Sequence, residues 1–311
     1  MRITEAFHDR FVLSFEVFPP KSEAGLERLC GADGGVLERL CGLGPDYISC
    51  TYGAGGSTVG RQLDILDRLK QDGRTIPLAH ITCIGNTLSS LRAQLERLLA
   101  HGIDHLLVLR GDLPAGWEST RGDLRYASEF VEFIRREFGG RFTIAVAGSP
   151  EGHIDSSSIE ADIAFLKRKQ DLGADYIMTQ LCWDMEQFRR WLDAIRAAGI
   201  HLPVDAGVMP VLDPASTLQL ALSRNGCALP RELCRLISRH WVFPHPFAKD
   251  TDDAAAAQKR ADFREAGIAY TIRQIEAYRA MGVGGIHLYS MNRYEDAARI
   301  VQGAGLAKGR A

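Results

Sequence analysis

A single glutamate interrupts an apolar segment near the start of the chain. Glu16 lies between Phe15 and the pair Val17-Phe18, in a segment that is typical of a β-strand and ends at two prolines. A carboxyl group with such neighbours loses solvation, which favours its protonated form and suits it to donate a proton near neutral pH. The alternative is a solvated acid at a strand end, or an acid paired with Lys21.

A second polar group follows the apolar segment 105–109 directly, and it reads Arg110-Gly111-Asp112. The arginine offers a planar fork of donors to a phosphate or carbonyl. The glycine lets a ligand approach the backbone, and the aspartate can stabilise positive charge that develops on a reacting heterocycle. The alternative is an Arg–Asp pair that closes the rim of the fold.

Other polar segments also follow apolar runs. Residues 51–58 (TYGAGGST) match the dinucleotide fingerprint only in part, so we interpret them as a loop that exposes N–H groups to a ligand, or as a plain turn. His153 follows the fifth run. Residues 167–169 are basic and by default form a solvated face. Gln180 could bond both edges of a heterocycle, or be a buried amide satisfied by the backbone.

Eight short apolar segments position these residues, and segments of helical periodicity separate them. A strand and a helix that alternate eight times predict an α/β fold of the (β/α)8 TIM-barrel type. Such barrels carry their chemistry where the strands end. The predicted strands are 11–18, 47–52, 78–84, 105–109, 142–147, 176–182, 202–209 and 285–290.

The helical segments give the domain organisation. Residues 1–10 are expected to form a lead-in helix or arm, and three helical segments between the seventh and eighth strands indicate an elaborated seventh connection rather than a second domain. We therefore expect residues 1–311 to form one catalytic domain. The other predicted helices are 22–43, interrupted at its glycines, 58–71, 88–101, 125–138, 158–172 and 185–198, and those of the seventh connection are 214–224, 230–240 and 252–281.

Composition excludes several classes of function. A formal net charge of -2 gives no indication of nucleic acid or an anionic membrane as a partner. The seven cysteines form no CxxC pair, and no histidine pair is accompanied by an acidic triad, so we expect reduced thiols and no metal site. No apolar stretch approaches the ~20 residues that a membrane span requires, and we expect a cytoplasmic protein.

Taken in order, these segments resemble the 5,10-methylenetetrahydrofolate reductase family, in its bacterial short form. The resemblance spans residues 11–293. It implies a barrel that holds non-covalent FAD at the strand ends and passes a hydride from NAD(P)H to methylenetetrahydrofolate by ping-pong kinetics. The residues that carry it are FEVFPPK at 15–21, TYGAGGS at 51–57, HITC at 80–83, LRGDLP at 109–114, PEGH at 150–153, LKRK at 166–169, TQ at 179–180, GVMP at 207–210 and HLYSMNR at 287–293.

The resemblance also implies roles for individual residues. Glu16 would be the general acid that helps to open the five-membered ring of the folate, and Asp112 would stabilise the cationic iminium and tune the flavin. Gln180 would hold the pterin and Arg293 the glutamyl end. The implied contacts to FAD are Thr51, Tyr52, Ala54, His80, Arg110, Gly111, Asp112, Ala127, His153, Asp162, Arg168 and Lys169.

The chain departs from the family pattern at several positions. Ser149 and Phe165 stand where the well-known bacterial form has Tyr and Asn beside FAD, and residues 225–230 are closer to a subgroup that works with an iron–sulfur partner. One alternative is therefore a flavin-binding subunit of a larger complex with a protein electron donor. Another is a related FAD barrel such as proline dehydrogenase. In the leading interpretation we expect a homo-oligomer.

Overall fold

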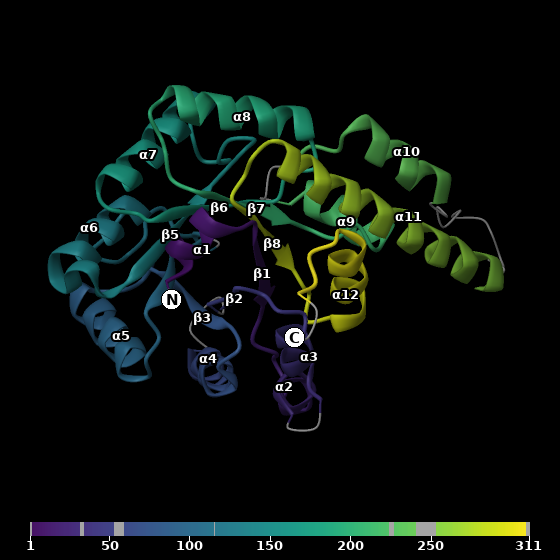
Figure 1. Cartoon of the computed structure of the whole chain (residues 1–311). Coiled ribbons are helices and arrows are strands. Elements are labelled where there is room, and N and C mark those ends of the chain that lie inside the picture. The colour runs from purple at the N-terminus through teal and green to yellow at the C-terminus, as the bar shows by residue number, and fades with distance from the viewer. Residues whose placement is uncertain are drawn as a thin grey trace.

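The computed structural model describes residues 2–31, 34–52, 59–114, 116–223, 227–240 and 253–308 of the chain. Eight parallel strands of this part form a closed barrel, in which each strand pairs with the next and the last pairs with the first (Figure 1). Each strand overlaps the segment predicted for it, so the predicted barrel is confirmed. The strands are β1 (Val12–Val17), β2 (Tyr47–Cys50), β3 (Ile76–Thr82), β4 (His105–Leu109), β5 (Thr143–Gly148), β6 (Tyr176–Thr179), β7 (Val204–Val208) and β8 (Gly285–Tyr289).

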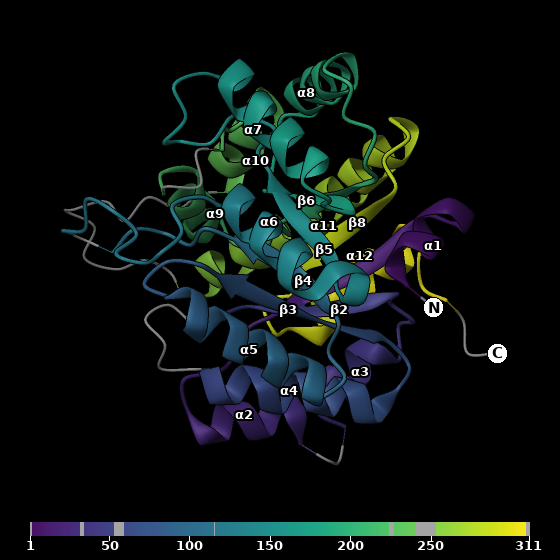
Figure 2. The ribbon, with the colours of Figure 1, turned by 90° about the vertical axis from the view of Figure 1, so that its left-hand side faces the viewer.

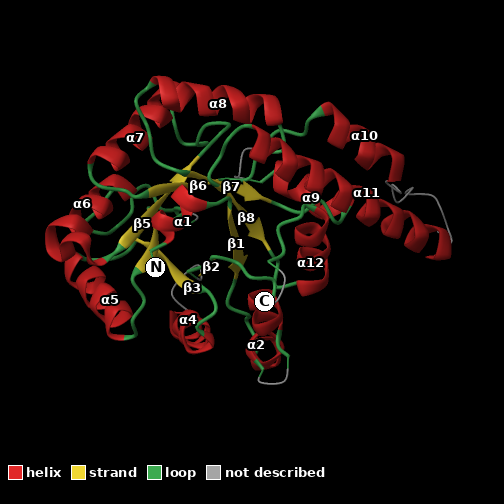
Figure 3. Cartoon of the chain, viewed as in Figure 1, coloured by secondary structure: helices red, strands yellow, loops and turns green. Residues whose placement is uncertain are grey.

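Helices surround this barrel on its outer side (Figure 3). The predicted segment 22–43 is two helices rather than one, as its internal glycines indicated. Gly173 and Gly199 follow their helices with φ values of 102° and 74°, the left-handed conformation that commonly ends a helix. The helices are α1 (Ile3–Asp9), α2 (Glu23–Cys30), α3 (Val36–Cys41), α4 (Val59–Asp72), α5 (Leu88–Ala100), α6 (Ala127–Phe138), α7 (Ile159–Asp171), α8 (Met185–Ala197), α9 (Pro214–Ala221), α10 (Arg231–His240), α11 (Asp253–Ala280) and α12 (Tyr294–Gly303).

The lead-in segment closes the amino end of the barrel. Ile3 and Ala6 of α1 pack in one apolar cluster with Val12, Tyr47 and other residues inside the barrel. In Figure 2, α1 lies at one end of the strands. Since this end is covered, only the carboxyl end of the barrel is left to admit a ligand.

The barrel interior contains a polar layer. Leu13, Phe15 and Val17 pack in the large apolar cluster that joins strands to helices, and side chains alternate along a strand, so Ser14 and Glu16 face the barrel axis. Among the other polar side chains buried within the strands are Tyr47, Ser49, His80, Asp205 and His287. The inner wall is therefore apolar near α1 and polar towards the carboxyl end.

The seventh connection is an elaborated insertion, as predicted, and it brings a core of its own. Residues of α10 and α11 pack with Leu181, Trp183 and Val211, which follow β6 and β7. Gly267 brings α11 against the backbone of Val211, and Thr271 accepts a hydrogen bond from the Val211 amide at 3.2 Å. None of the described helices has both the length and the apolar character of a membrane span.

Gly267→Ala tests this close approach. A Cβ atom at residue 267 would overlap the carbonyl oxygen of Val211, which is backbone and cannot turn aside. We expect the free energy of unfolding in urea to fall by at least about 2 kcal/mol. Gly140→Ala is the matched control, because its Cβ would meet nothing within 4 Å at a φ of -88°. Equal stability of the two variants would contradict the packing described.

The buried His80 predicts an acid-dependent loss of stability. Burial lowers the pKa of His80 from 6.5 to about 4, against a smaller opposing effect of Glu16. The unfolded chain therefore binds a proton at His80 at pH values where the folded chain does not. The free energy of unfolding should fall as the pH decreases from about 6.5 towards 4, by roughly 2 kcal/mol between pH 7.5 and pH 5 from this residue.

Urea unfolding of His80→Gln at these two pH values measures this contribution. We expect the variant to lose less stability on acidification than the wild type by that amount. His201→Gln, at an exposed position, should behave as the wild type does. The same pH dependence in His80→Gln and in the wild type would show that His80 does not exclude a proton in the folded state.

Candidate active site

Glu16 lies on the inner wall of the barrel near the carboxyl end of β1. Its register partners are Ser49 of β2 and Tyr289 of β8. The Glu16 side chain is 20% exposed, and two imidazole nitrogens approach its Oε2 atom: His80 Nε2 at 3.6 Å and His287 Nε2 at 3.7 Å. The acid therefore lies at the polar mouth, partly accessible and between two rings.

The neighbours of Glu16 show whether this acid is held in an ion pair, as the alternative with Lys21 required. Lys21 is exposed, and the described residues contain no ion pair between Lys21 and Glu16. The pKa of about 4 leaves His80 neutral at pH 7, so its contact with Glu16 is not an ion pair despite the short distance. Within the described part of the chain, His80 Nε2 has no hydrogen-bond partner. This buried nitrogen lies beside the Glu16 carboxyl group with its hydrogen-bonding capacity unused in the described structure.

Supporting residues that sequence reasoning did not single out hold this region in place. Ser290 donates through its Oγ to the Glu16 carbonyl at 2.6 Å, and the Asn292 side chain bonds both the N–H and the C=O of Phe18. Gln62 of α4 donates to the carbonyl of Cys50 at 2.9 Å and to that of His80. Asn292 was noted as a polar residue at a strand end and in the resemblance, but not as a partner of Phe18, and nothing in the sequence connects Gln62 with β2 and β3.

The segment after β4 is not arranged as the Arg110–Asp112 pair that was the alternative interpretation of these residues. Arg110 pairs with Asp155 at 2.8 Å, rather than with Asp112. Gly111 has a φ of 89° and contacts Ile84 so closely that a Cβ would not fit without displacing it. Asp112 is exposed after this turn. The turn thus directs a carboxylate outward while the arginine is held by a partner from the loop after β5.

The loop after β2 is described only at its start. The Thr51 amide donates to the Val17 carbonyl at 3.0 Å, which continues the β1–β2 ladder. The Tyr52 hydroxyl donates to Gln94 of α5 at 3.3 Å, and burial raises the pKa of this phenol. Tyr52 is therefore anchored to α5. Ala54, the other cofactor position predicted here, lies outside the described residues.

Charged side chains lie between α7 and the loop that follows β5. Lys169 donates to the Ala147 carbonyl at 2.9 Å, and burial lowers its pKa, although Asp162 opposes this. Burial likewise raises the pKa of Asp162, against the opposing charges of Lys169 and His153. Arg168 is exposed. Three of the predicted cofactor residues thus interact with one another, and the fourth faces solvent.

The remaining predicted residues lie around the same end. Ala127 is the first residue of α6, next to Tyr126, whose ring stacks on Phe165 with centroids 5.8 Å apart. Gln180 follows β6, and its Oε1 accepts a hydrogen bond from the Leu181 amide at 2.9 Å. Arg293 is the exposed N-cap residue of α12. These positions follow β4, β6 and β8, so the fold gathers them at the carboxyl end.

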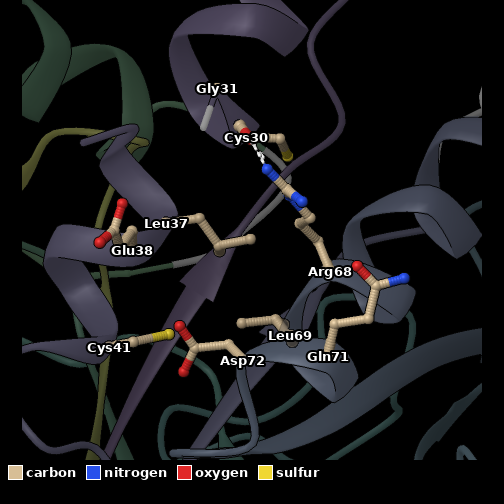
Figure 4. A pocket seen from close by; sticks show the side chains of 9 residues that line it. All are labelled: Cys30, Gly31, Leu37, Glu38, Cys41, Arg68, Leu69, Gln71 and Asp72. Carbon is tan, nitrogen blue, oxygen red and sulfur yellow. Dashed lines mark hydrogen bonds between the residues drawn. The ribbon is translucent and has the colours of Figure 1, made fainter. Parts of the chain in front are cut away.

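A separate cavity of about 290 Å³ lies outside the barrel, between α2, α3 and α4 (Figure 4). Arg68 donates there to the Cys30 carbonyl. Burial raises the pKa of Cys30 to about 11 and that of Cys41 to about 12, so both thiols are protonated at neutral pH and poor nucleophiles. The described residues hold no cluster of three metal-binding side chains.

Comparison with known proteins agrees with this arrangement. The family model described as methylenetetrahydrofolate reductase matches residues 2–305. Methylenetetrahydrofolate reductase (NADH) 1 of Arabidopsis thaliana is 33% identical over 307 residues, which cover 94% of this chain and 48% of that protein. The 5,10-methylenetetrahydrofolate reductase of Escherichia coli is 30% identical over 297 residues, which cover 96% of this chain and 92% of that protein.

A solved structure shares the fold at low sequence identity. An uncharacterized protein from Clostridium thermocellum, described as binding two copies of 5-methyl-5,6,7,8-tetrahydrofolic acid, superimposes with a TM-score of 0.61 at 16% identity and covers 97% of each chain. The chain spans about half the length of the plant relatives it matches. The match over nearly the whole chain shows that it belongs to the methylenetetrahydrofolate reductase family.

Proposed function

We propose that this chain reduces 5,10-methylenetetrahydrofolate to 5-methyltetrahydrofolate, with FAD as cofactor and NAD(P)H as hydride donor in a ping-pong reaction. Membership of the family supports the substrate. The observation that carries the chemistry is the placement of Glu16, whose carboxyl group is partly exposed at the barrel mouth between two imidazoles. A proton donor in such a place can act on a nitrogen of a bound heterocycle.

The residues of the mouth fit a flavin dinucleotide. His80 Nε2 is a buried nitrogen without a partner in the described structure, the stacked rings of Tyr126 and Phe165 are exposed, and Arg168 offers a free guanidinium edge to solvent. A ring system, an adenine and a pyrophosphate would match these groups in turn. FAD supplies the transfer of a hydride from NAD(P)H to the methylene carbon. The other residues proposed to hold it are Thr51, Tyr52, Ala54, Arg110, Gly111, Asp112, Ala127, His153, Asp162 and Lys169.

The chain itself contributes the proton and the binding contacts. Glu16 donates a proton to the folate nitrogen that leaves when the five-membered ring opens. The exposed Asp112 carboxylate stabilises the cationic substrate that results. Gln180 bonds the pterin through its amide, and Arg293 binds the glutamyl carboxylates at the rim. Because His80 is neutral, it places no positive charge beside the Glu16 carboxyl group.

Spectroscopy of the purified protein tests the cofactor and both half-reactions. We expect a flavin spectrum that NADH or NADPH bleaches under anaerobic conditions and that methylenetetrahydrofolate restores. A colourless protein that binds no added FAD would refute the proposal. Bleaching only in the presence of a co-purified partner would favour a protein electron donor instead.

Glu16→Gln separates the two half-reactions. The amide cannot donate a proton as an acid does, so reoxidation of the flavin by methylenetetrahydrofolate should slow by about 10²–10⁴-fold. Reduction by NAD(P)H needs no such proton and should stay within about twofold of the wild type. Stopped-flow absorbance at the flavin band measures both rates.

Glu132→Gln, at an exposed position on α6, is the matched control and should leave both rates unchanged. An equal loss of both rates in Glu16→Gln would mean that the variant disturbs the flavin site and that Glu16 is not the proton donor.

A further inference from the structure

A carboxylate is buried in the middle of the barrel, below the mouth. Asp205 of β7 is 0% exposed, and its Oδ2 accepts a hydrogen bond from the Tyr47 hydroxyl at 2.6 Å. Ser14 Oγ lies 3.1 Å from the same oxygen. Asp205 Oδ1 has no hydrogen-bond partner among the described residues. Burying such a carboxyl group lowers the stability of the fold, because each unpaired oxygen loses its hydration. This loss of stability indicates that Asp205 has a role.

The contacts continue from Asp205 to the mouth. Ser14 Oγ lies 2.7 Å from His287 Nδ1, and the opposite nitrogen of that ring, Nε2, lies 3.7 Å from Glu16 Oε2 and 3.3 Å from Ser49 Oγ. The ring of His287 also stacks on that of Tyr47 at 5.6 Å, which fixes its plane. One chain of polar atoms therefore runs from β7 through β1 and β8 to Glu16.

The other groups around both carboxyls leave this chain intact. Burial raises the pKa values of both tyrosines near Asp205 and of Tyr289 near Glu16, so these phenols stay protonated, and burial raises that of Cys50. Burial also raises the pKa of Asp205 to about 6, so it is mostly ionised at pH 7. Four groups interact with Glu16: His80, His287, Cys50 and Tyr289. The groups that interact with Asp205 are Ser14, Tyr47, Tyr176, His287, Tyr289 and Asp46.

The Ser14 hydroxyl has one proton, for which Asp205 Oδ2, the Ile286 carbonyl at 3.2 Å and His287 Nδ1 are the acceptors within reach. When Asp205 is ionised it draws that proton, so at 2.7 Å the His287 Nδ1–H must donate to Ser14 Oγ. The lone pair of Nε2 then faces Ser49 Oγ at 3.3 Å and Glu16 Oε2 at 3.7 Å and attracts a proton on either of these groups. When Asp205 carries the proton instead, Ser14 donates to Nδ1, and Nε2–H faces a Glu16 carboxylate. Both arrangements contain the same number of protons.

We propose that Asp205, Ser14 and His287 are positioning residues that determine, through the tautomer of His287, whether Glu16 carries the proton needed for folate reduction. The proposal rests on the proton-donor role of Glu16 in the proposed function. The ionised Asp205 keeps the ring proton of His287 on Nδ1 and so turns the Nε2 lone pair towards Glu16. The buried carboxylate thus acts on the reaction without touching the substrate.

The tautomer of His287 tests the proposal without substrate or turnover. In ¹⁵N NMR spectra of histidine-labelled protein at pH 7, assigned with His287→Gln, we expect a protonated Nδ1 and an unprotonated Nε2. Ser14→Ala removes the acceptor of the Nδ1–H, so the proton should move to Nε2. A wild-type ring protonated at Nε2, or a tautomer unchanged in Ser14→Ala, would overturn the proposal.

The pH profile of flavin reoxidation by methylenetetrahydrofolate gives the second readout. In Ser14→Ala and in Asp205→Asn, the midpoint of the descending limb should move to lower pH by about one unit, a tenfold change in the proton equilibrium. Ser14→Thr keeps the hydroxyl and should restore the wild-type midpoint. Asp296→Asn removes another buried carboxylate, one bonded to Arg264, and should leave the midpoint unchanged.

The outcomes separate this proposal from the function on which it rests. If both Ser14→Ala and Asp205→Asn are folded by circular dichroism and the midpoint of the pH profile is unchanged in both, the proposed role of Asp205, Ser14 and His287 is overturned. Glu16 can still be the proton donor in that case. A tautomer that moves as expected in a protein that does not reoxidise its flavin with folate would show that Ser14 sets the tautomer of His287 but would refute the proposed reaction and, with it, the role in folate reduction.

Discussion

The pairing of β8 with β1 is the constraint on which the rest of the structure depends. This ladder closes the barrel and sets Glu16 opposite Tyr289, while β2 places Ser49 on its other side. Side chains alternate along a strand, so a slip of one residue would turn Phe15 inward and Glu16 towards the helices. The two hydrogen bonds from Ser290 to the Glu16 carbonyl hold the last step of this register. The position of the acid is therefore a property of barrel closure.

The same closure forces polar groups into a dry interior. Most of them are satisfied by one another, as Tyr47, Ser14 and Asp205 show. His80 Nε2, Asp205 Oδ1 and the Tyr176 hydroxyl are exceptions within the described part of the chain, and leaving such an atom unpaired costs about 1–3 kcal/mol. The apolar layer between strands and helices offsets this cost. Two of these exceptions, on His80 and Asp205, lie on side chains that surround or act on Glu16, which is where a protein tolerates such a loss when function requires it.

The sequence allowed the strands, the helices and the insertion to be predicted, because apolar periodicity and helix-ending glycines such as Gly173 are local signals. It also indicated that Glu16 lies in a strand at the mouth. It could not show that Arg110 pairs with Asp155, because that contact joins two loops whose distance depends on the whole barrel. Asp205 and His287 were missed as partners for the same reason: 82 positions separate them, and only the register of β7, β8 and β1 brings Ser14 between them.

The distribution of charge from axis to rim suggests how a ligand is oriented. Near the axis at the mouth lie the neutral His80 and the carboxyl of Glu16, with the buried carboxyl of Asp205 below them. At the rim, Arg168 and Arg293 are exposed, and each would gain a charge-assisted bond from an anion. The chain as a whole has a formal charge of -2, so it exerts no general attraction on anions. A molecule with flat uncharged rings and anionic tails would therefore enter ring first, because the reverse orientation would bring its tails against the carboxyl group and leave the rim arginines without a partner.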